Sequence, residues 1–115
     1  MANENSISTI GIIGGGKVGV HLLELFSGSK LAKVIYIVDR EHSAPGLVKA
    51  RADHIDTFTD IDAALARHTA DFLFEVTGSD KLLECVRGKL DGKPTELVTH
   101  EMAFVILQVI EQRDL

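Results

Sequence analysis

The feature that most constrains the fold is a Gly-x-Gly-x-x-Gly pattern at residues 14–19, which follows an apolar stretch at residues 8–13 and opens an amphipathic stretch that runs to residue 27. A chain that passes from strand to glycine turn to helix gathers free backbone N–H groups at the positive end of the helix dipole. We predict that Gly14 permits the tight turn, that Gly16 lets the backbone approach a pyrophosphate, and that Gly19 lets the helix pack closely on the sheet. The residues predicted to hold a ligand at this turn are Gly14, Gly15, Gly16, Lys17, Val18 and Gly19.

A second apolar stretch, residues 34–38, ends at Asp39, twenty residues after Gly19. A carboxylate at the tip of the second strand is typical of dinucleotide-binding domains, where it accepts hydrogen bonds from the adenosine ribose. Its charge repels the extra phosphate of NADP, so the sequence favours NAD as the cofactor, with NADP the less favoured one. Arg40 leaves this choice open, because a guanidinium beside the ribose either stacks on the adenine or attracts a 2′-phosphate.

Strand-like and helix-like stretches alternate along the whole chain with short connections. This alternation predicts an α/β fold, namely a three-layer, doubly wound parallel sheet of the Rossmann-like type with strand order 3-2-1-4-5. We expect Gly28 to end the first helix and Thr59 to cap the third. The predicted strands are residues 8–13, 33–38, 55–58, 71–76 and 95–98, and the predicted helices are residues 17–27, 47–53, 60–67 and 81–89 and a last helix after residue 98.

Ligands of such sheets bind at the carboxyl edge where the winding reverses, between the first and fourth strands. The turn at residues 14–19 should therefore face Thr77, Gly78 and Ser79 across one cleft. Gly78 would let the backbone approach the adenosine, and Thr77 or Ser79 could donate a hydroxyl to ribose or phosphate. The alternative, in which these residues only cap the next helix, stays open.

The sequence assigns no catalytic residue. His100 follows the fifth predicted strand, where a nicotinamide would point, but we expect a helix-start or surface histidine rather than an acid–base catalyst, because hydride transfer also needs a pocket for a second molecule. Glu75 and Asp71 flank a strand without forming an evident carboxylate pair.

The remaining histidines and the single cysteine do not predict a metal site or a reactive thiol. The remaining four histidines are scattered singly, without the spacing of a zinc site, so no metal is predicted. The single cysteine, Cys85, falls in a predicted helix, where a buried thiol is expected rather than a reactive one.

The bulk composition excludes several classes of protein. The 115 residues carry a formal net charge of −5, with 45% hydrophobic and 25% charged residues, as in ordinary globular domains. We expect one domain at residues 1–115, short for a dehydrogenase and therefore a candidate for a domain excised from a longer protein. The lack of a basic run predicts no nucleic-acid partner, and the lack of a long apolar run predicts no membrane insertion and a cytoplasmic location.

The last predicted helix is apolar over more than half of its circumference, from Met102 to Ile110, which is wider than one core contact needs. We expect this helix to mediate dimerisation or to pass into a following domain, and we expect Phe104 on its narrower face to be at least partly exposed. The alternative is a fully buried sheet-packing helix.

The stretches at residues 12–19, 38–39 and 74–78 together resemble the nucleotide-binding half of the homoserine and aspartate dehydrogenases and dihydrodipicolinate reductases. The resemblance covers nearly the whole chain. It departs after the fifth predicted strand, where Thr99-His100-Glu101-Met102 replaces the Thr-Ala-Asn-Lys type motif of the homoserine enzymes. The cofactor contacts that the resemblance implies are Gly14, Gly16, Gly19, Asp39, Thr77 and Gly78.

The pattern Ile37-Val38-Asp39, with Ala44-Pro45-Gly46 and residues 75–78, also resembles Rossmann-type input domains that precede PAS, histidine kinase or σ54-activator modules in bacterial signalling proteins. This resemblance implies a regulatory or redox-sensing NAD(H)-binding domain whose terminal helix meets a second copy or an output domain. One alternative is the cofactor domain of an NAD-dependent dehydrogenase lacking its substrate domain. Another is the nucleotide-gated regulatory domain of potassium transporters, which usually carries Gly-Asp where this chain has Thr59-Asp60. A fold that has lost its ligand is the remaining alternative.

Overall fold

The computed structural model describes residues 6–113, with side chains described as far as residue 111. The polar tail at residues 1–5 lies outside the described part. Five parallel strands form one sheet in the order β3-β2-β1-β4-β5, which confirms the predicted order. In chain order the elements are β1 (Ser8–Ile13), α1 (Lys17–Ser27), β2 (Ala32–Val38), α2 (Pro45–Ala52), β3 (Asp56–Phe58), α3 (Ile61–Arg67), β4 (Phe72–Glu75), α4 (Asp80–Lys89), β5 (Glu96–Val98) and α5 (His100–Arg113).

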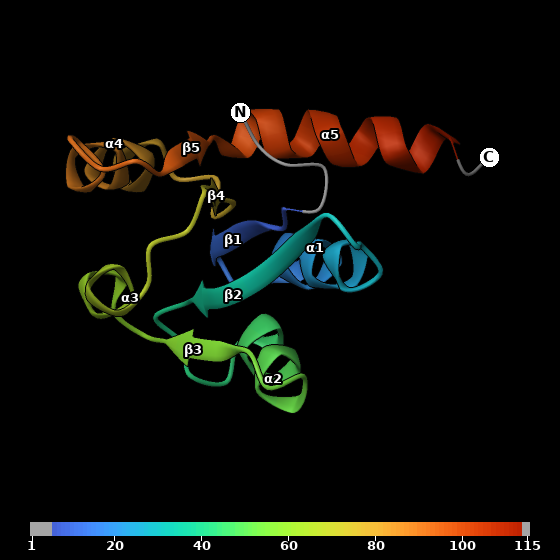
Figure 1. Ribbon diagram of the computed structural model, residues 1–115, viewed down its shortest axis with the longest axis horizontal. Helices are drawn as coiled ribbons and strands as arrows, with labels where there is room; N and C mark the ends of the chain where they lie inside the picture. Colours follow the sequence, from blue (N-terminus) through green and yellow to red (C-terminus); the bar gives the residue numbers. More distant parts are fainter. Residues whose placement is uncertain (1–5, 114–115) are drawn as a thin grey trace.

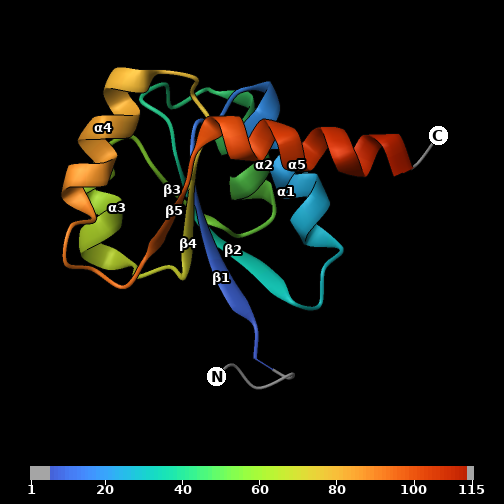
Figure 2. The same cartoon turned by 90° about the horizontal axis from the view of Figure 1, so that it is seen from above.

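The helices cover both faces of the sheet, so the fold has the three layers that the sequence predicts. Helices α1, α2 and α5 lie on one face, and α3 and α4 lie on the other (Figures 1 and 2). In both views the C-terminal part of α5 extends beyond the rest of the molecule. The winding of the chain reverses between β1 and β4, which leaves the carboxyl ends of these two strands open to a ligand.

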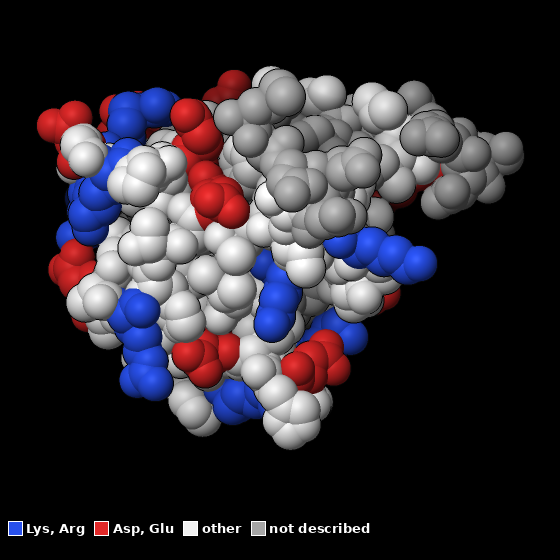
Figure 3. Space-filling model, in the orientation of Figure 1, with Lys and Arg blue, Asp and Glu red and all other residues white. Residues whose placement is uncertain are grey.

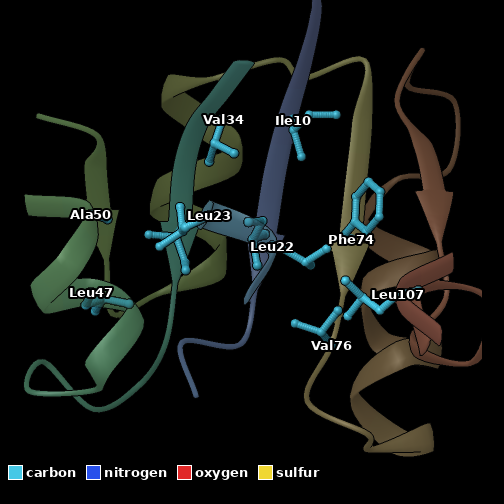
Figure 4. Close-up of a cluster of buried hydrophobic side chains, with 12 residues drawn as sticks. Ile10, Leu22, Leu23, Val34, Leu47, Ala50, Phe74, Val76 and Leu107 are labelled. Carbon is cyan, nitrogen blue, oxygen red and sulfur yellow. The ribbon is translucent and has the colours of Figure 1, made fainter. Parts of the chain in front are cut away.

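Each face of the sheet has its own apolar core. On the α1 side, Leu22 and Leu47 are completely buried, and they belong to one core cluster that extends from α2 to Phe74 and Leu107 (Figure 4). Full burial of one such side chain contributes about 1.5–3 kcal/mol to folding. The second core lies between the sheet and helices α3 and α4 and includes the fully buried Val86. The two cores hold the strands, and therefore the loops at their carboxyl ends, in fixed positions.

Gly11 and Tyr36 show why a glycine stands in the middle of the central strand. A Cβ atom on Gly11 would lie 2.3 Å from Cζ of Tyr36, so only glycine leaves room for this ring on the neighbouring strand β2. The pairing of β1 with β2 also changes register between Ile10 and Gly11. Tyr36 is almost completely buried, and its hydroxyl has no hydrogen-bond partner among the described residues.

Burial of the Tyr36 ring predicts an unusual alkaline titration. Desolvation raises the pKa of Tyr36 from 10.0 to about 12. Because the unfolded chain ionises this tyrosine at the lower pH, raising the pH between these two values favours unfolding. Tyr36 is the only tyrosine and there is no tryptophan, so ultraviolet absorbance reports this ring alone. We expect no phenolate signal near pH 10 while the chain is folded, and a folded chain that titrates there would contradict the burial.

Several element boundaries differ from the predicted ones by one or two residues. Thr59 is not the cap of α3, because the side chain of Asp60 accepts the hydrogen bond from the amide of Ala63. Helix α2 begins at Pro45 rather than at residue 47, since proline is well suited to the first turn of a helix. Gly28 ends α1 as predicted.

The surface carries both signs of charge. On the face shown in Figure 3, lysine and arginine side chains are interspersed with aspartate and glutamate side chains. The described part of this face therefore carries no continuous patch of one sign. Among the helices of residues 6–113, none is both long enough and apolar enough to cross a bilayer.

Candidate functional site

A cleft of about 920 Å³ opens at the carboxyl edge of the sheet. Its walls come from the turn between β1 and α1, from the end of β2, and from the loop between β4 and α4, as the sequence predicts. Gly15, Gly19 and Gly78 do not line the cleft: Gly15 and Gly19 are buried in the β1–α1 segment, and Gly78 is exposed in the β4–α4 loop. The predicted site residues that line the cleft are Gly14, Gly16, Lys17, Val18, Asp39, Arg40, Thr77 and Ser79.

The glycines of the first turn have three different surroundings. Gly14 has a φ of +120°, which side chains rarely tolerate, and it turns the chain out of β1. A Cβ atom on Gly16 would meet nothing within 4 Å, so this residue faces open space in the cleft. A Cβ atom on Gly19 would lie 2.1 Å from the carbonyl oxygen of Gly14, so this glycine permits the close packing of α1 on the turn.

The N-terminus of α1 offers unpaired N–H groups to the cleft. The first amides of a helix have no partner within the helix. Side chains fill this role in α3 and α4, which are capped by Asp60 and Ser79. Helix α1 has no side-chain cap at Gly16 and no acidic residue in its first turn. Together with Lys17, which lines the cleft, the start of α1 therefore gives an electropositive site suited to a phosphate group.

Asp39 is fixed in place by the turn that it faces. Its Oδ2 atom accepts a hydrogen bond from the amide of Gly15 at 2.8 Å, and its Oδ1 atom accepts one from the amide of Glu41 at 2.9 Å. A carboxylate has about four acceptor positions, so both oxygens can still accept a hydroxyl from a ligand. The carboxylate is thus oriented before any ligand arrives.

The loop after β4 divides its hydroxyl groups between the fold and the cleft. Gly78 has a φ of +80°, so the bend of this loop requires glycine. The Thr77 hydroxyl donates to Oε2 of Glu75 and accepts from the amide of Ser79. The hydroxyl proton of Thr77 is therefore held in a hydrogen bond within the protein rather than offered to a ligand. The Ser79 hydroxyl accepts from the amide of Leu82 as a helix cap, and its own proton remains for a ligand.

Glu75 and His100 form a buried pair that the sequence did not predict. Glu75 has no exposed surface, and His100, the first residue of α5, is also buried. The Nδ1 atom of His100 lies 2.5 Å from Oε1 of Glu75, and its Nε2 atom lies 3.3 Å from an oxygen of Asp80. The hydrogen bond to Glu75 raises the pKa of His100, and the charges of Glu75, Asp80 and Glu101 act in the same direction. His100 is a helix-start residue as expected, but it does not lie at the surface.

Asp80, His100 and Glu101 bring three candidate metal-binding atoms within 4.8 Å of one another. The two carboxylates are exposed and lie in the first turns of α4 and α5, where acidic residues compensate the helix dipole. We assign no ion to this group.

Solved structures share this arrangement of strands and helices. The WlbA dehydrogenase from Bordetella pertussis, in complex with NADH and UDP-GlcNAcA, superimposes with a TM-score of 0.71 at 18% identity over 86% of this chain. GenD2 from gentamicin A biosynthesis, in complex with NAD, gives 0.70 at 21% identity over 85% of the chain. An oxidoreductase from Agrobacterium radiobacter, in complex with NAD+, L-tartaric acid and magnesium, gives 0.69 at 18% identity over 82%.

The fold is Rossmann-like. The Rossmann-like chain spans 29%, 28% and 27% of the lengths of these three structures. No protein-family model matches the sequence, and neither does any curated protein.

Two parts of the Rossmann-like site were missed by sequence reasoning. Gly46, for which the sequence predicted no contact with the glycine turn, donates its amide to the carbonyl of Gly15 at 2.6 Å and lets α2 approach this turn. Cys85 lies on α4 as predicted, but it is exposed and lines the cleft, so the expectation of a buried thiol was wrong. Leu82, Ile61 and Thr59 also line this cleft. Helix periodicity predicts these helices but not which residues face the cleft.

Proposed function

We propose that this chain is a dinucleotide-binding domain that takes NAD+ or NADH in the cleft between the β1–α1 turn and the β4–α4 loop. The observation that carries the proposal is the uncapped start of α1 with open space above Gly16, next to the fixed carboxylate of Asp39. This combination suits a pyrophosphate followed by a ribose. The complexes of the structural neighbours with NAD or NADH support the same ligand. When bound, the nicotinamide supplies hydride-transfer chemistry.

In this proposal each predicted residue has a role that follows from its position. The amides at Gly16, Lys17 and Val18 and the charge of Lys17 bind the pyrophosphate, while Gly14, Gly15 and Gly19 shape the turn. Asp39 accepts the adenosine ribose hydroxyls and disfavours NADP, and Arg40 lies beside the adenine. Gly78 and the Ser79 hydroxyl contact the adenosine side, with Thr77 holding this loop in shape.

We further propose a regulatory or redox-sensing role for this domain at residues 1–115, in the cytoplasm. Support comes from α5, whose side chains Met102, Val105 and Val109 are more than half exposed and are spaced to lie along one stripe. Phe104 is 41% exposed, as predicted for its face of the helix. Such an apolar stripe on a projecting helix suits a second copy of the chain or a following output domain. A sensor should bind NAD+ and NADH with unequal affinity.

The second candidate function is the cofactor-binding part of an NAD-dependent dehydrogenase. The neighbours favour it, because solved structures named as oxidoreductases or dehydrogenases contain this fold within a chain about three times as long. An enzyme part should support hydride transfer to a hydroxy or carbonyl substrate once its substrate domain is supplied. A sensor should instead change its oligomeric state or the conformation of α5 when it binds the dinucleotide.

Asp39→Ala tests the cofactor assignment directly. We expect the affinity for NAD+ to fall by about tenfold to a hundredfold, because hydrogen bonds to a charged acceptor are lost. The ratio of NADP+ to NAD+ affinity should rise, because the repulsion of the 2′-phosphate is removed. Isothermal calorimetry with NAD+, NADH, NADP+ and ATP measures both effects.

Asp91→Ala is the matched control, since this exposed aspartate lies before β5 at the opposite edge of the sheet. It should leave all affinities unchanged. Equal NAD+ affinity in Asp39→Ala and the unaltered chain would contradict the proposed site, and the absence of binding by every nucleotide would show that the fold has lost its ligand.

A further inference from the structure

Glu75 links the cleft to α5 through its two carboxylate oxygens. Oε2 accepts hydrogen bonds from both the amide, at 2.8 Å, and the hydroxyl of Thr77, which lines the cleft. Oε1 accepts the hydrogen bond of Nδ1 of His100, the residue with which α5 begins. One carboxylate therefore holds a wall of the ligand cleft on one side and the start of a helix on the other.

The part of this link between Glu75 and His100 is removed from water. Glu75 has no exposed surface and the His100 side chain is 7% exposed, so water cannot replace a hydrogen bond that either residue loses. An unpaired buried carboxylate is strongly unfavourable, and a network of this kind moves as a unit or not at all. A shift of the Thr77 loop is therefore transmitted to His100 or is resisted by it.

Only a few charged groups among the described residues surround His100. Among the described residues, those facing His100 are Glu75 of β4, Asp80 of α4 and Glu101 of α5. All three are carboxylates, so His100 supplies the positive charge of the group when its imidazole is protonated. Below the pKa of the imidazole, His100 balances Glu75 and adds to the attraction of a negatively charged ligand at this edge of the sheet.

We propose that Glu75 and His100 are positioning residues that hold the Thr77 loop for the dinucleotide and couple occupancy of the cleft to α5. This inference rests on the proposed dinucleotide function and adds to it the route by which binding reaches the apolar stripe of α5. The protonated His100 favours the bound state, so deprotonation weakens both binding and coupling. Neither residue touches the reacting atoms in this role.

The test compares the full chain with His100→Gln, using NADH as the probe. In the unaltered chain, saturating NADH should slow backbone hydrogen exchange in the first two turns of α5 by about fivefold or more, the lower end of usual coupling between sites. Its NADH affinity should fall by about threefold as the pH rises through the pKa of His100, which the hydrogen bond to Glu75 raises above the usual 6.5, as expected for loss of one nearby positive charge. His100→Gln should lose both the slowing in α5 and the pH dependence.

His21→Gln is the matched control, because His21 of α1 also contacts a carboxylate of α5, Glu111, at 3.5 Å, but both side chains are more than half exposed. In this variant, NADH should still slow hydrogen exchange in the first two turns of α5. If thermal unfolding shows that His100→Gln does not fold, the Thr77→Val variant decides the test, since Thr77 is exposed and loss of its hydroxyl removes one of the two hydrogen bonds that Oε2 of Glu75 accepts from Thr77, while the bond from the Thr77 amide stays. The Thr77→Val variant should bind NADH more weakly, and NADH should slow hydrogen exchange in its α5 less than in the unaltered chain.

The outcomes separate the two proposals. NADH binding with no change in α5, or with the α5 response and pH dependence retained in His100→Gln, would overturn the coupling and leave the proposed function standing. No binding of NADH by the unaltered chain would overturn both.

Discussion

Gly16→Val is expected to abolish dinucleotide binding while the chain stays folded. A Cβ atom at this position meets no protein atom within 4 Å, so the valine side chain extends into the cleft, where the pyrophosphate is proposed to lie. It also shields the amides at the start of α1, which have no side-chain cap. We expect the affinity for NADH to fall by at least about a hundredfold, or about 2.7 kcal/mol, in calorimetry. The thermal midpoint without ligand should change little.

Gly28→Val is the matched control for this experiment. Gly28 ends the same helix, has a φ of −90°, and also has no atom within 4 Å of an added Cβ. The same substitution at the far end of α1 should therefore leave NADH binding intact. If Gly16→Val bound NADH as tightly as Gly28→Val does, the ligand could not lie over the glycine turn.

Gly19→Ala is expected to have the largest effect on stability. The added methyl group would lie 2.1 Å from the carbonyl oxygen of Gly14, and this oxygen belongs to the backbone of a tight turn that cannot easily move. We expect a loss of about 3 kcal/mol in the free energy of unfolding, at the upper end of the usual range for overpacking. The thermal midpoint should fall by about 10 °C or more, which circular dichroism or calorimetry measures.

Gly88→Ala separates this packing effect from the general effect of replacing a helical glycine. Gly88 lies within α4, is exposed, and has no atom within 4 Å of an added Cβ. Alanine is favoured over glycine in a helix by about 0.8–1.0 kcal/mol, so this variant should be slightly more stable. A Gly19→Ala variant that was as stable as Gly88→Ala would show that α1 does not pack closely on the turn.

The order of strands and helices could be predicted because it depends on local patterns. The apolar stretch of β1, the glycine turn and the apolar face of α1 are each visible within a few residues, and α1 has the bounds that its periodicity predicts. The strand order follows from the handedness of short crossovers. The spacing of Asp39 from the turn predicted a carboxylate at the tip of the second strand, and in the structure this carboxylate accepts a hydrogen bond from the turn at Gly15.

The features that were missed depend on contacts between distant segments. Glu75 and His100 are 25 residues apart, and neither has a local pattern that distinguishes a buried pair from two surface residues. The rotation of α4 about its axis decides whether Cys85 faces the core or the cleft, and the sequence of α4 permits either. Thr59 and Asp60 are both good capping residues, and only the backbone path after β3 selects Asp60. The roles assigned to the cleft residues toward a cofactor remain predictions.

The two outer strands of the sheet limit how copies of this chain can contact one another. β3 and β5 each contain only three residues, so the open sides of the sheet present few free amides and carbonyls to a strand of another molecule. Short outer strands are one of the ways in which proteins avoid edge-to-edge aggregation. Growth of the sheet across molecules is therefore disfavoured at both sides, so any contact between copies of this chain would form through helices or loops rather than by adding strands.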